Sequence, residues 1–141
     1  LNITKEIEGY MEKWNITLIA IASISLIVGG IGLFGTLLIS IQERMTEIGV
    51  RKSVGATEKD IFYYFIFEAL VLALCGALLG ILLAWIALSV ISKAIHFPLY
   101  LPVQGALVGL LFSLATGFVS GLYPALKAAA VDPIQAIYYF E

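Results

Sequence analysis

Three long stretches without a charged residue constrain the fold of this chain more than any other feature. They cover residues 16–41, 69–92 and 97–126, which are 26, 24 and 30 residues long. A helix needs about 20 apolar residues to cross the roughly 30 Å hydrocarbon layer of a membrane. The chain is 61% hydrophobic and 13% charged, whereas about a quarter of a typical soluble domain is charged. The sequence therefore predicts an all-α membrane protein with three transmembrane helices.

The residues around these stretches argue against several other classes of protein. The first stretch is longer than the apolar core of a cleavable signal peptide, which has about 7–15 residues, and acidic residues precede it. Cys75 is the single cysteine, so no disulfide framework is expected. The net charge is −2 and no basic run suits nucleic acid. Because the chain begins with Leu1, we expect a piece of a longer protein.

Three spans place the two ends of the chain on opposite sides of the membrane. Cytoplasmic segments of membrane proteins carry an excess of Lys and Arg. The connector between the first two spans and the C-terminal tail together hold five basic residues: Arg44, Arg51, Lys52, Lys59 and Lys127. The other side holds three: Lys5, Lys13 and Lys93. The distribution predicts a multi-pass protein with its N-terminus outside and its C-terminus in the cytoplasm.

The pattern divides the chain into seven predicted segments. They are a stalk helix end at 1–15, a first transmembrane helix at 16–41, a cytoplasmic helix and turn at 42–57, a long second transmembrane helix at 58–92, an extracytoplasmic loop at 93–103, a third transmembrane helix at 104–126 and a cytoplasmic tail with a short helix at 127–141. The stalk is predicted because apolar residues before the first span fall on one helical stripe. That stripe consists of Ile3, Ile7, Tyr10, Met11 and Trp14. We expect it to continue into the span, the alternative being a frayed amphipathic end.

Local signals place the ends of the second helix. Thr57 followed by Asp60 matches a capping box, in which side chains bind exposed backbone N–H groups at a helix start. Pro98 and Pro102 discourage helix and mark the loop that follows. His96 stands in that loop without a second metal ligand nearby, so a solvent-facing side chain is expected, not a metal site.

The end of the third span carries its own signals. Pro124 removes a backbone donor and is expected to kink or end the span. Asp132 and Pro133 read as the cap and first position of a short terminal helix. Its shared face would hold Ile134, Ile137 and Tyr138.

Small residues recur in all three spans. Spacing of four puts them on one helix face, where two backbones can approach closely. The predicted packing positions are Gly29, Gly30, Gly32, Gly76, Gly80, Gly117 and Gly121. The alternative is that glycine is simply common in membrane helices, and the spacing does not identify the partner helix.

The connector between the first two spans gathers eight of the eighteen charged residues between Glu43 and Asp60. Read as one helix from Glu43 to Val54, it has Arg44, Glu47 and Arg51 on one face, with Glu47 and Arg51 in the favourable i,i+4 order. Met45 and Ile48 lie toward its apolar side, and Gly55 is expected to end it. One interpretation is a solvated hairpin whose basic residues only set the topology. The other is a docking surface for another protein.

This connector does not fit a nucleotide site. The segment GVRKSVGAT contains glycines and a lysine, but a phosphate-binding loop needs G-x-x-x-x-G-K-[ST] in that order. Five residues separate Gly49 from Gly55, and Ala56 follows where the lysine is required. We therefore expect the chain not to be an ATP-hydrolysing enzyme itself. The spans also lack the acidic pair or histidine relay of ion-coupled transport.

Two segments of the chain carry ordered motifs. The first is VGGIGLFGTLLISIQERMTEIGVRKSVGATEKDI, a Gly-rich helix followed by the pattern E-R-x-x-E-I-G-[IV]-R-K-[AS]-[LV]-G-A. The second is YPALKAAAVDPIQAI, with the pattern P-A-x-x-A-A-x-x-[DN]-P-[IV]-x-A-[LI]. Both motifs resemble those of FtsX-like permeases, and most of all those of the MacB-type ABC transporter group. The resemblance covers most of the chain from about residue 16 onward.

The resemblance implies the last three spans of a bacterial inner-membrane permease whose first span and extracytoplasmic domain precede them. The segment from Glu43 to Ala56 would be the coupling helix that docks on an ABC ATPase subunit or domain. Its docking residues would be Glu43, Arg44, Glu47, Ile48, Gly49, Arg51, Lys52, Gly55 and Ala56. The charged residues among them would face or orient the ATPase. Ile48 and Val54 would hold the helix against the bundle. ATP and Mg²⁺ would be bound by that ATPase, with no cofactor in this chain, and two permease copies, identical or homologous, would work as a pair in the lipid bilayer.

Glu68 matches a glutamate found near the inner headgroups in that family. It is expected either to pair with Arg51 or Lys52 and anchor the coupling helix, or to reach the headgroup water. For the function, the resemblance implies that ATPase motion passes through the coupling helix to the extracytoplasmic domain for export or efflux. Two rivals stay open: a signalling subunit that controls a cell-wall hydrolase, and a small helical protein that oligomerises through its glycine faces.

Overall fold

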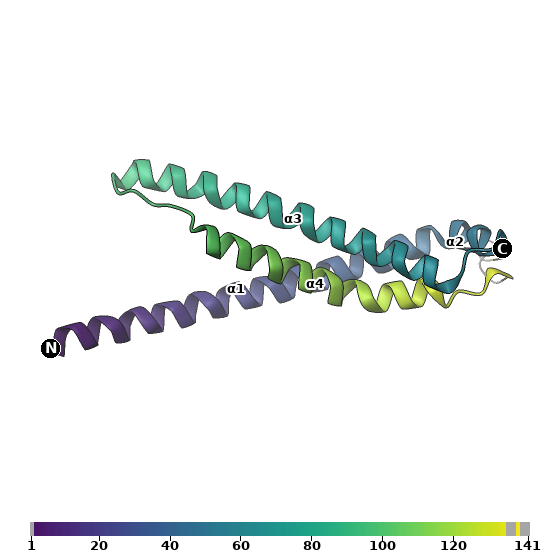
Figure 1. Ribbon diagram of the computed structural model, residues 1–141, viewed down its shortest axis with the longest axis horizontal. Coiled ribbons are helices and arrows are strands. Elements are labelled where there is room, and N and C mark those ends of the chain that lie inside the picture. Colours follow the sequence, from purple (N-terminus) through teal and green to yellow (C-terminus); the bar gives the residue numbers. More distant parts are fainter. Residues whose placement is uncertain (1, 135–137, 139–141) are drawn as a thin grey trace.

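The computed structural model describes residues 2–134 and 138. Within them the chain forms four helices, labelled in Figure 1: α1 (Asn2–Glu43), α2 (Met45–Ser53), α3 (Glu58–Ile95) and α4 (Val103–Ala129). Three of them, α1, α3 and α4, are long and apolar enough to cross a membrane. The all-α fold with three candidate spans is therefore confirmed.

The helix α4 lies between α1 and α3 and packs against both (Figure 1). The three long helices converge at the end where α2 lies, which we call the α2 end of the bundle. Toward the opposite end, α1 and α3 separate from each other (Figure 1). At roughly 1.5 Å per residue, α1 is about 63 Å long and α3 about 57 Å. Both exceed the hydrocarbon thickness, so each must tilt or project beyond it.

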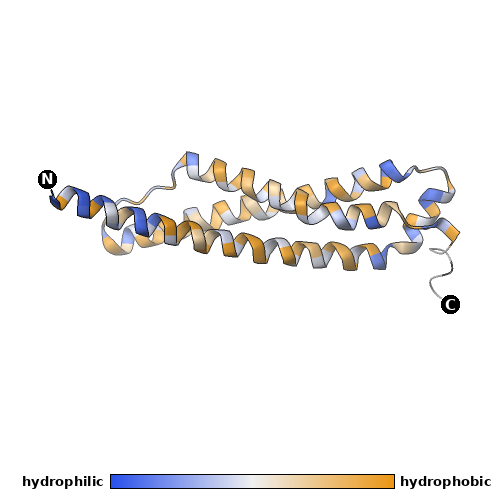
Figure 2. Cartoon of the chain, turned by 90° about the horizontal axis from the view of Figure 1, so that it is seen from below, coloured by the Kyte–Doolittle hydropathy of each residue, from blue (hydrophilic) through white to orange (hydrophobic). Residues whose placement is uncertain are grey.

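The surface between the two ends of the bundle is apolar. Figure 2 shows hydrophilic residues gathered at the N-terminal part of α1 and at the α2 end, with hydrophobic residues between them. Ile24, Leu83 and Leu111 are each more than 60% exposed. Hydroxyl groups in this region bind backbone carbonyls of their own helix, as Ser23 Oγ does with the Ile19 carbonyl at 2.7 Å. The surface therefore suits lipid, in which polar groups must be satisfied internally.

The helix α1 has no break between the N-terminal apolar stripe and the span. It is a single helix from Asn2 to Glu43, so the continuous arrangement holds. All five residues of the stripe are more than half exposed within this chain. Their use as a stalk against another part of the protein stays a prediction.

The charged connector differs from the single helix expected over Glu43–Val54. The first helix extends to Glu43, the chain turns at Arg44 (φ −102°, ψ 14°), and α2 begins at Met45 and ends at Ser53. Glu43 is thus the last residue of α1. The bend lets α2 leave the axis of α1 and lie against the bundle, which a straight continuation would not allow.

Both ends of α3 carry identifiable caps. Thr57 and Asp60 form the predicted capping box: the Thr57 N–H donates to Asp60 Oδ2 at 2.8 Å, and the Asp60 N–H donates to Thr57 Oγ1 at 3.3 Å. The helix ends at Ile95, three residues later than expected, and His96 follows in the left-handed conformation with φ 53°. Pro98 lies in the connection to α4.

Of the two predicted effects of Pro124, a kink or an end of the third span, the end is wrong, because α4 continues through this residue to Ala129. Proline in a helix removes one backbone hydrogen bond and costs about 3 kcal/mol. Here Pro124 is fully buried, and the next turn buries Ala125 and Ala128 completely. Packing of this last turn offsets the missing bond, so the helix persists.

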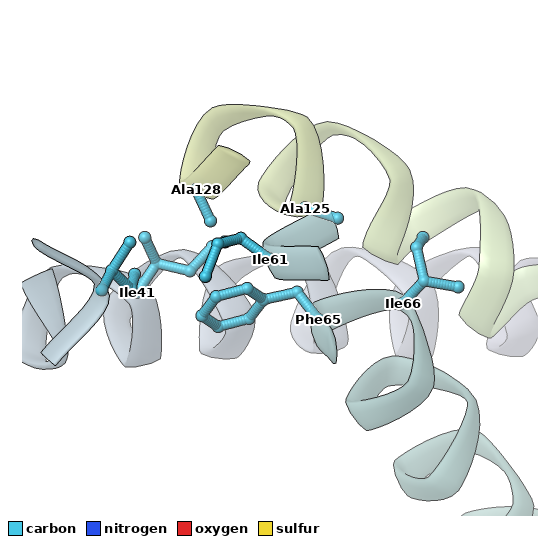
Figure 3. Close-up of a cluster of buried hydrophobic side chains, with 7 residues drawn as sticks. Ile41, Ile61, Phe65, Ile66, Ala125 and Ala128 are labelled. Carbon is cyan, nitrogen blue, oxygen red and sulfur yellow. The ribbon is translucent and has the colours of Figure 1, made fainter. Parts of the chain in front are cut away.

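A cluster of buried apolar side chains joins all four helices at the α2 end (Figure 3). Phe65 and Ile61 lie at its centre, each 3% exposed. The cluster consists of Ile41 from α1, Ile48 from α2, Ile61, Phe65 and Ile66 from α3, and Ala125 and Ala128 from α4. Residues that are buried elsewhere include Leu37, Ala69 and Ala73. The cluster therefore fixes α2 to the three long helices at one end.

Small residues allow α4 to approach both neighbours closely. A Cβ atom built on Gly121 would lie 2.5 Å from Ala69 Cβ, and one on Gly117 would overlap Ala73 Cβ. Ser113 Oγ donates to the Ala73 carbonyl at 3.2 Å across the same contact. On the other side, a Cβ on Gly30 would lie 2.8 Å from Thr116 Cγ2.

Four other predicted packing positions, Gly29, Gly32, Gly76 and Gly80, meet nothing within 4 Å of an added Cβ. Packing at these positions stays a prediction about contacts outside this chain. The start of the predicted terminal helix is visible where the Ile134 N–H donates to Asp132 Oδ1 at 3.0 Å. Ile137 lies outside the described residues, and Tyr138 lies in a bend with its side chain 70% exposed.

Candidate functional site

The helix α2 is short, and its ends are set by local chemistry. After Ser53 the Gly55 N–H donates to the Lys52 carbonyl at 3.1 Å and the Ala56 N–H to the Arg51 carbonyl at 3.0 Å. These two bonds form a Schellman motif, which requires a left-handed residue. Gly55 supplies it with φ +111°. The predicted end of the helix at Gly55 is thus realised in this motif, and Thr57 then begins α3.

The two sides of α2 differ in burial. Ile48 is 3% exposed and belongs to the buried cluster, and Gly49 beside it is also buried. On the opposite side Val50 is 52% exposed and Val54 is 84% exposed. Ile48 therefore holds α2 against the bundle as expected. The same expectation for Val54 is wrong, because its position after the last turn points the side chain away from the bundle.

The outer side of α2 carries an ion pair. Arg51 Nη2 lies 2.6 Å from Glu47 Oε1, in the predicted i,i+4 arrangement. The Arg51 guanidinium also lies 4.7 Å from the centre of the Tyr64 ring on α3. Contacts of this kind contribute about 0.5–1 kcal/mol each at exposed sites. They hold the two charges in a defined place on the surface without burying them.

Arg44 joins the turn between α1 and α2 to α3. Its Nη1 lies 3.4 Å from Glu68 Oε1 and donates to Tyr64 Oη at 3.4 Å. The expected partners of Glu68, Arg51 and Lys52, are therefore wrong. The physical reason is the bend at Arg44, which brings this side chain over the face of α3 on which Tyr64 and Glu68 lie four residues apart. The side chains are 42% and 25% exposed, so the pair contributes less than about 1 kcal/mol.

Lys52 turns toward α4. Its Nζ donates to the carbonyls of Ala129 and Val131, the second at 2.7 Å. Ala129 is the last residue of α4 and is itself buried, and Val131 lies two residues after it. Lys52 therefore points away from the exposed Glu47–Arg51 pair.

A shallow and mostly apolar hollow lies between α2 and the first turns of α3. It is lined by Val50, Arg51, Val54, Ala56, Asp60, Ile61 and Tyr64. The exposed valines give it an apolar wall, and Arg51 and Asp60 give it charges of opposite sign. A surface of this kind can accept an apolar side chain of another protein inside a polar rim.

Glu43 ends α1 and Gly55 forms the turn after α2, and the other residues expected in the site separate into three groups. Glu47, Arg51 and the hollow form the outer surface, Ile48 and Gly49 are buried, and Arg44 and Lys52 bind α3 and α4. Tyr64 was missed by sequence reasoning. It lies four residues before Glu68 and therefore on the same face of α3, and this face contacts Arg44 and Arg51. Within the part of the chain that the structure describes, no group of three His, Cys, Asp or Glu side chains could hold a metal ion.

Comparison with known proteins gives a consistent result. The model of the "FtsX-like permease C-terminal" family matches residues 19–133. The chain is 43% identical over 120 residues to an uncharacterized ABC transporter permease, YknZ, of Bacillus subtilis, covering 85% of this chain and 30% of that protein. It is 38% identical over 138 residues to the macrolide export ATP-binding/permease protein MacB of Bdellovibrio bacteriovorus, covering 98% and 21%. A second B. subtilis permease, YvrN, is 36% identical over 137 residues, covering 97% and 34%. The chain thus spans between 21% and 34% of the length of these three relatives.

Proposed function

The chain belongs to the FtsX-like permease family, and from this premise we propose that it is the membrane part of an ABC transporter whose ATPase docks on α2. The ATPase, as a separate subunit or a fused domain, binds ATP and Mg²⁺. Its movement passes through α2 to the three long helices, and from them to an extracytoplasmic part of the protein, for export or efflux. On this proposal the α2 end lies in the cytoplasm and the N-terminus of α1 lies outside.

The packing of α2 is the observation that carries this proposal. Ile48 lies in one cluster with side chains of α1, α3 and α4, so a displacement of α2 acts on all three spans at the same time. A close-packed interior transmits such a displacement because it has little free volume. Away from the cluster, α1 and α3 separate (Figure 1), and their far ends are free to move with a partner domain.

The outer side of α2 has the features of a docking surface. Glu47 and Arg51 present both signs of charge, and the hollow beside them offers exposed valines. Charges at the rim of an interface guide association and fix the register, while apolar contacts at its centre provide most of the affinity. A purely solvated hairpin needs none of the exposed apolar surface of Val50 and Val54.

An added Cβ at Gly29, Gly32, Gly76 or Gly80 meets nothing within 4 Å in this chain, so other membrane helices can approach at these positions. We propose that a second copy of the permease, or a homologous one, and a further span of the same protein occupy this part of the membrane. Small residues permit close approach of such helices.

Charge reversal tests the docking role. The complete permease that contains this chain is expressed with its ATPase, and the amount of ATPase that copurifies is measured for Glu47→Arg and for Arg51→Glu. Each single variant breaks the 2.6 Å ion pair and inverts one surface charge. We expect each to lose most of the bound ATPase while the permease still inserts in the membrane.

The double variant Glu47→Arg/Arg51→Glu is the matched control for internal stability. It restores an ion pair within α2 but presents the charges in exchanged positions. If docking depends on which position carries which charge, the amount of copurified ATPase stays low in the double variant. Full recovery of ATPase binding would show instead that the pair only stabilises α2, and unchanged binding in all three variants would refute docking at this surface.

A further inference from the structure

The ammonium group of Lys52 lies in a partly buried position at the C-terminal end of α4. The carbonyls of Leu126 and Ala128 accept hydrogen bonds from backbone amides that follow the helix. The carbonyls of Ala129 and Val131 accept from Lys52 Nζ. The acceptors lie 77 and 79 residues further along the chain, so the contact links two distant segments.

The position suits an ammonium group. The C-terminal end of a helix carries a partial negative charge from its unpaired carbonyls, and a cation there is stabilising. Hydrogen bonds from a charged donor are about twice as strong as those between neutral groups. Both bonds of Lys52 are partly buried, where water competes less for the donor.

The helix α2, which Lys52 joins to α4 near its C-terminal end, is joined to α3 at its N-terminal end. Arg44, directly before α2, binds Tyr64 and Glu68 of α3. The two ends of α2 are thus joined to two different spans by polar contacts of defined direction. From α4 the apolar cluster between them contains only the small side chains Ala125 and Ala128, so Lys52 adds a contact of defined direction to that packing.

We propose that Lys52 is a positioning residue that couples α2 to α4. Displacement of α2 is transmitted to the C-terminal end of α4 through the ammonium group, while Arg44 transmits it to α3. Lys52 does not bind the ATPase. This inference rests on the proposed function, because it assumes that an ATPase moves α2.

The first test concerns the permease alone and does not depend on an ATPase. Spin labels are attached at Val54→Cys and Lys127→Cys, two exposed positions on either side of the contact, with Cys75 replaced by alanine. Lys52→Met, which keeps the length of the side chain but cannot donate, is expected to broaden the distance distribution. It should lower the population of the joined state about tenfold, as expected for the loss of charge-assisted hydrogen bonds. Lys59→Met, which removes an exposed lysine of α3, should leave the distribution unchanged.

The second test separates positioning from docking. In the complete permease with its ATPase, Lys52→Met is expected to keep ATPase copurification at the level of the unchanged protein and to lose the stimulation of ATP hydrolysis that the permease gives to its ATPase, measured against the ATPase alone. Lys52→Arg, which keeps charge and donors, should recover part of that stimulation. If Lys52→Met does not insert in the membrane, Lys52→Gln provides a neutral side chain that retains a donor, and the same two readouts apply.

Two results would overturn the proposal. One is an unchanged distance distribution in Lys52→Met, which would mean that the contact does not hold the helices together. The other is a loss of ATPase binding as large as that caused by charge reversal at Glu47 or Arg51, which would make Lys52 a docking residue. Failure of the proposed function itself would appear differently, as unchanged ATPase binding in the charge-reversal variants, and the spin-label result would stand.

Discussion

The contact between α3 and α4 gives a prediction that can be worked from atomic distances. In Gly121→Ala the added Cβ would lie 2.5 Å from Ala69 Cβ, far inside the 3.5–4.0 Å at which two carbon atoms attract each other. Ala69 is completely buried, so it has no free space into which to move. Both atoms are fixed to their backbones, and no rotation of a side chain can relieve the overlap.

The magnitude follows from two opposing effects. Overpacking a well-packed contact costs about 1–3 kcal/mol, and we expect the upper value because the helices themselves must move apart. Alanine is favoured over glycine in a helix by about 1 kcal/mol. The net expectation for Gly121→Ala is a decrease of about 2 kcal/mol in the free energy of unfolding.

Two further variants make the prediction specific. At Gly80 an added Cβ meets nothing within 4 Å in this chain, so in the isolated chain, without a partner helix, Gly80→Ala is expected to be stabilising by about 1 kcal/mol through helix propensity. In the double variant Gly121→Ala/Ala69→Gly the Cβ atom at position 69 is absent, so the added Cβ at position 121 no longer overlaps it. We expect the double variant to recover about 1–2 kcal/mol of the lost free energy of unfolding, measured as a coupling energy.

Unfolding of the detergent-solubilised protein by increasing SDS, followed by tryptophan fluorescence, measures these differences. Equal stabilities of Gly121→Ala and Gly80→Ala would refute the reasoning, because they would show that α3 and α4 do not approach as closely as described. Absence of rescue in the double variant would show that the clash is not with Ala69.

Three other expectations concern the α2 end and use the same unfolding measurement. Phe65→Ala, at a 3% exposed position, should lower the free energy of unfolding by about 3–5 kcal/mol. Phe67→Ala, at a 68% exposed position, should lower it much less. Equal effects of the two variants would contradict the described core. Gly55→Ala should be destabilising by about 1 kcal/mol or more because φ is +111°. Gly55→Asn should be better tolerated. An alanine variant as stable as the unchanged protein would count against the Schellman motif. Thr57→Ala should remove the cap of α3 at a cost of about 1 kcal/mol, and a similar loss is expected for Asp60→Ala, which breaks the other half of the capping box.

Much of the fold could be predicted because its signals are local. The three uncharged stretches correspond to α1, α3 and α4, since a membrane span is defined by the length and polarity of one segment. Thr57 with Asp60 marked the start of α3, and Gly55 marked the turn before it. The i,i+4 pair of Glu47 and Arg51 is also a property of one helix and needs no tertiary contact.

Errors occurred where packing opposes a local preference. Pro124 is a helix breaker by propensity, yet the buried turn that contains Ala125 and Ala128 keeps α4 helical. The connector was expected as one helix from Glu43 onward, and the bend at Arg44 follows from the approach of α2 to the bundle. Periodicity within one segment contains no information about either contact.

The sequence by itself determined the number of spans, the N-terminal cap of α3 and the family to which the chain belongs, because each depends on residues close together along the chain. Only the tertiary structure decided that Glu68 binds Arg44 and that Lys52 binds the carbonyls of Ala129 and Val131. A charge in the sequence does not specify its partner, since several opposite charges and all backbone carbonyls are available to it. The angle between the helices decides which of them comes within hydrogen-bond distance, and that angle is set by the small residues and the buried cluster between the helices.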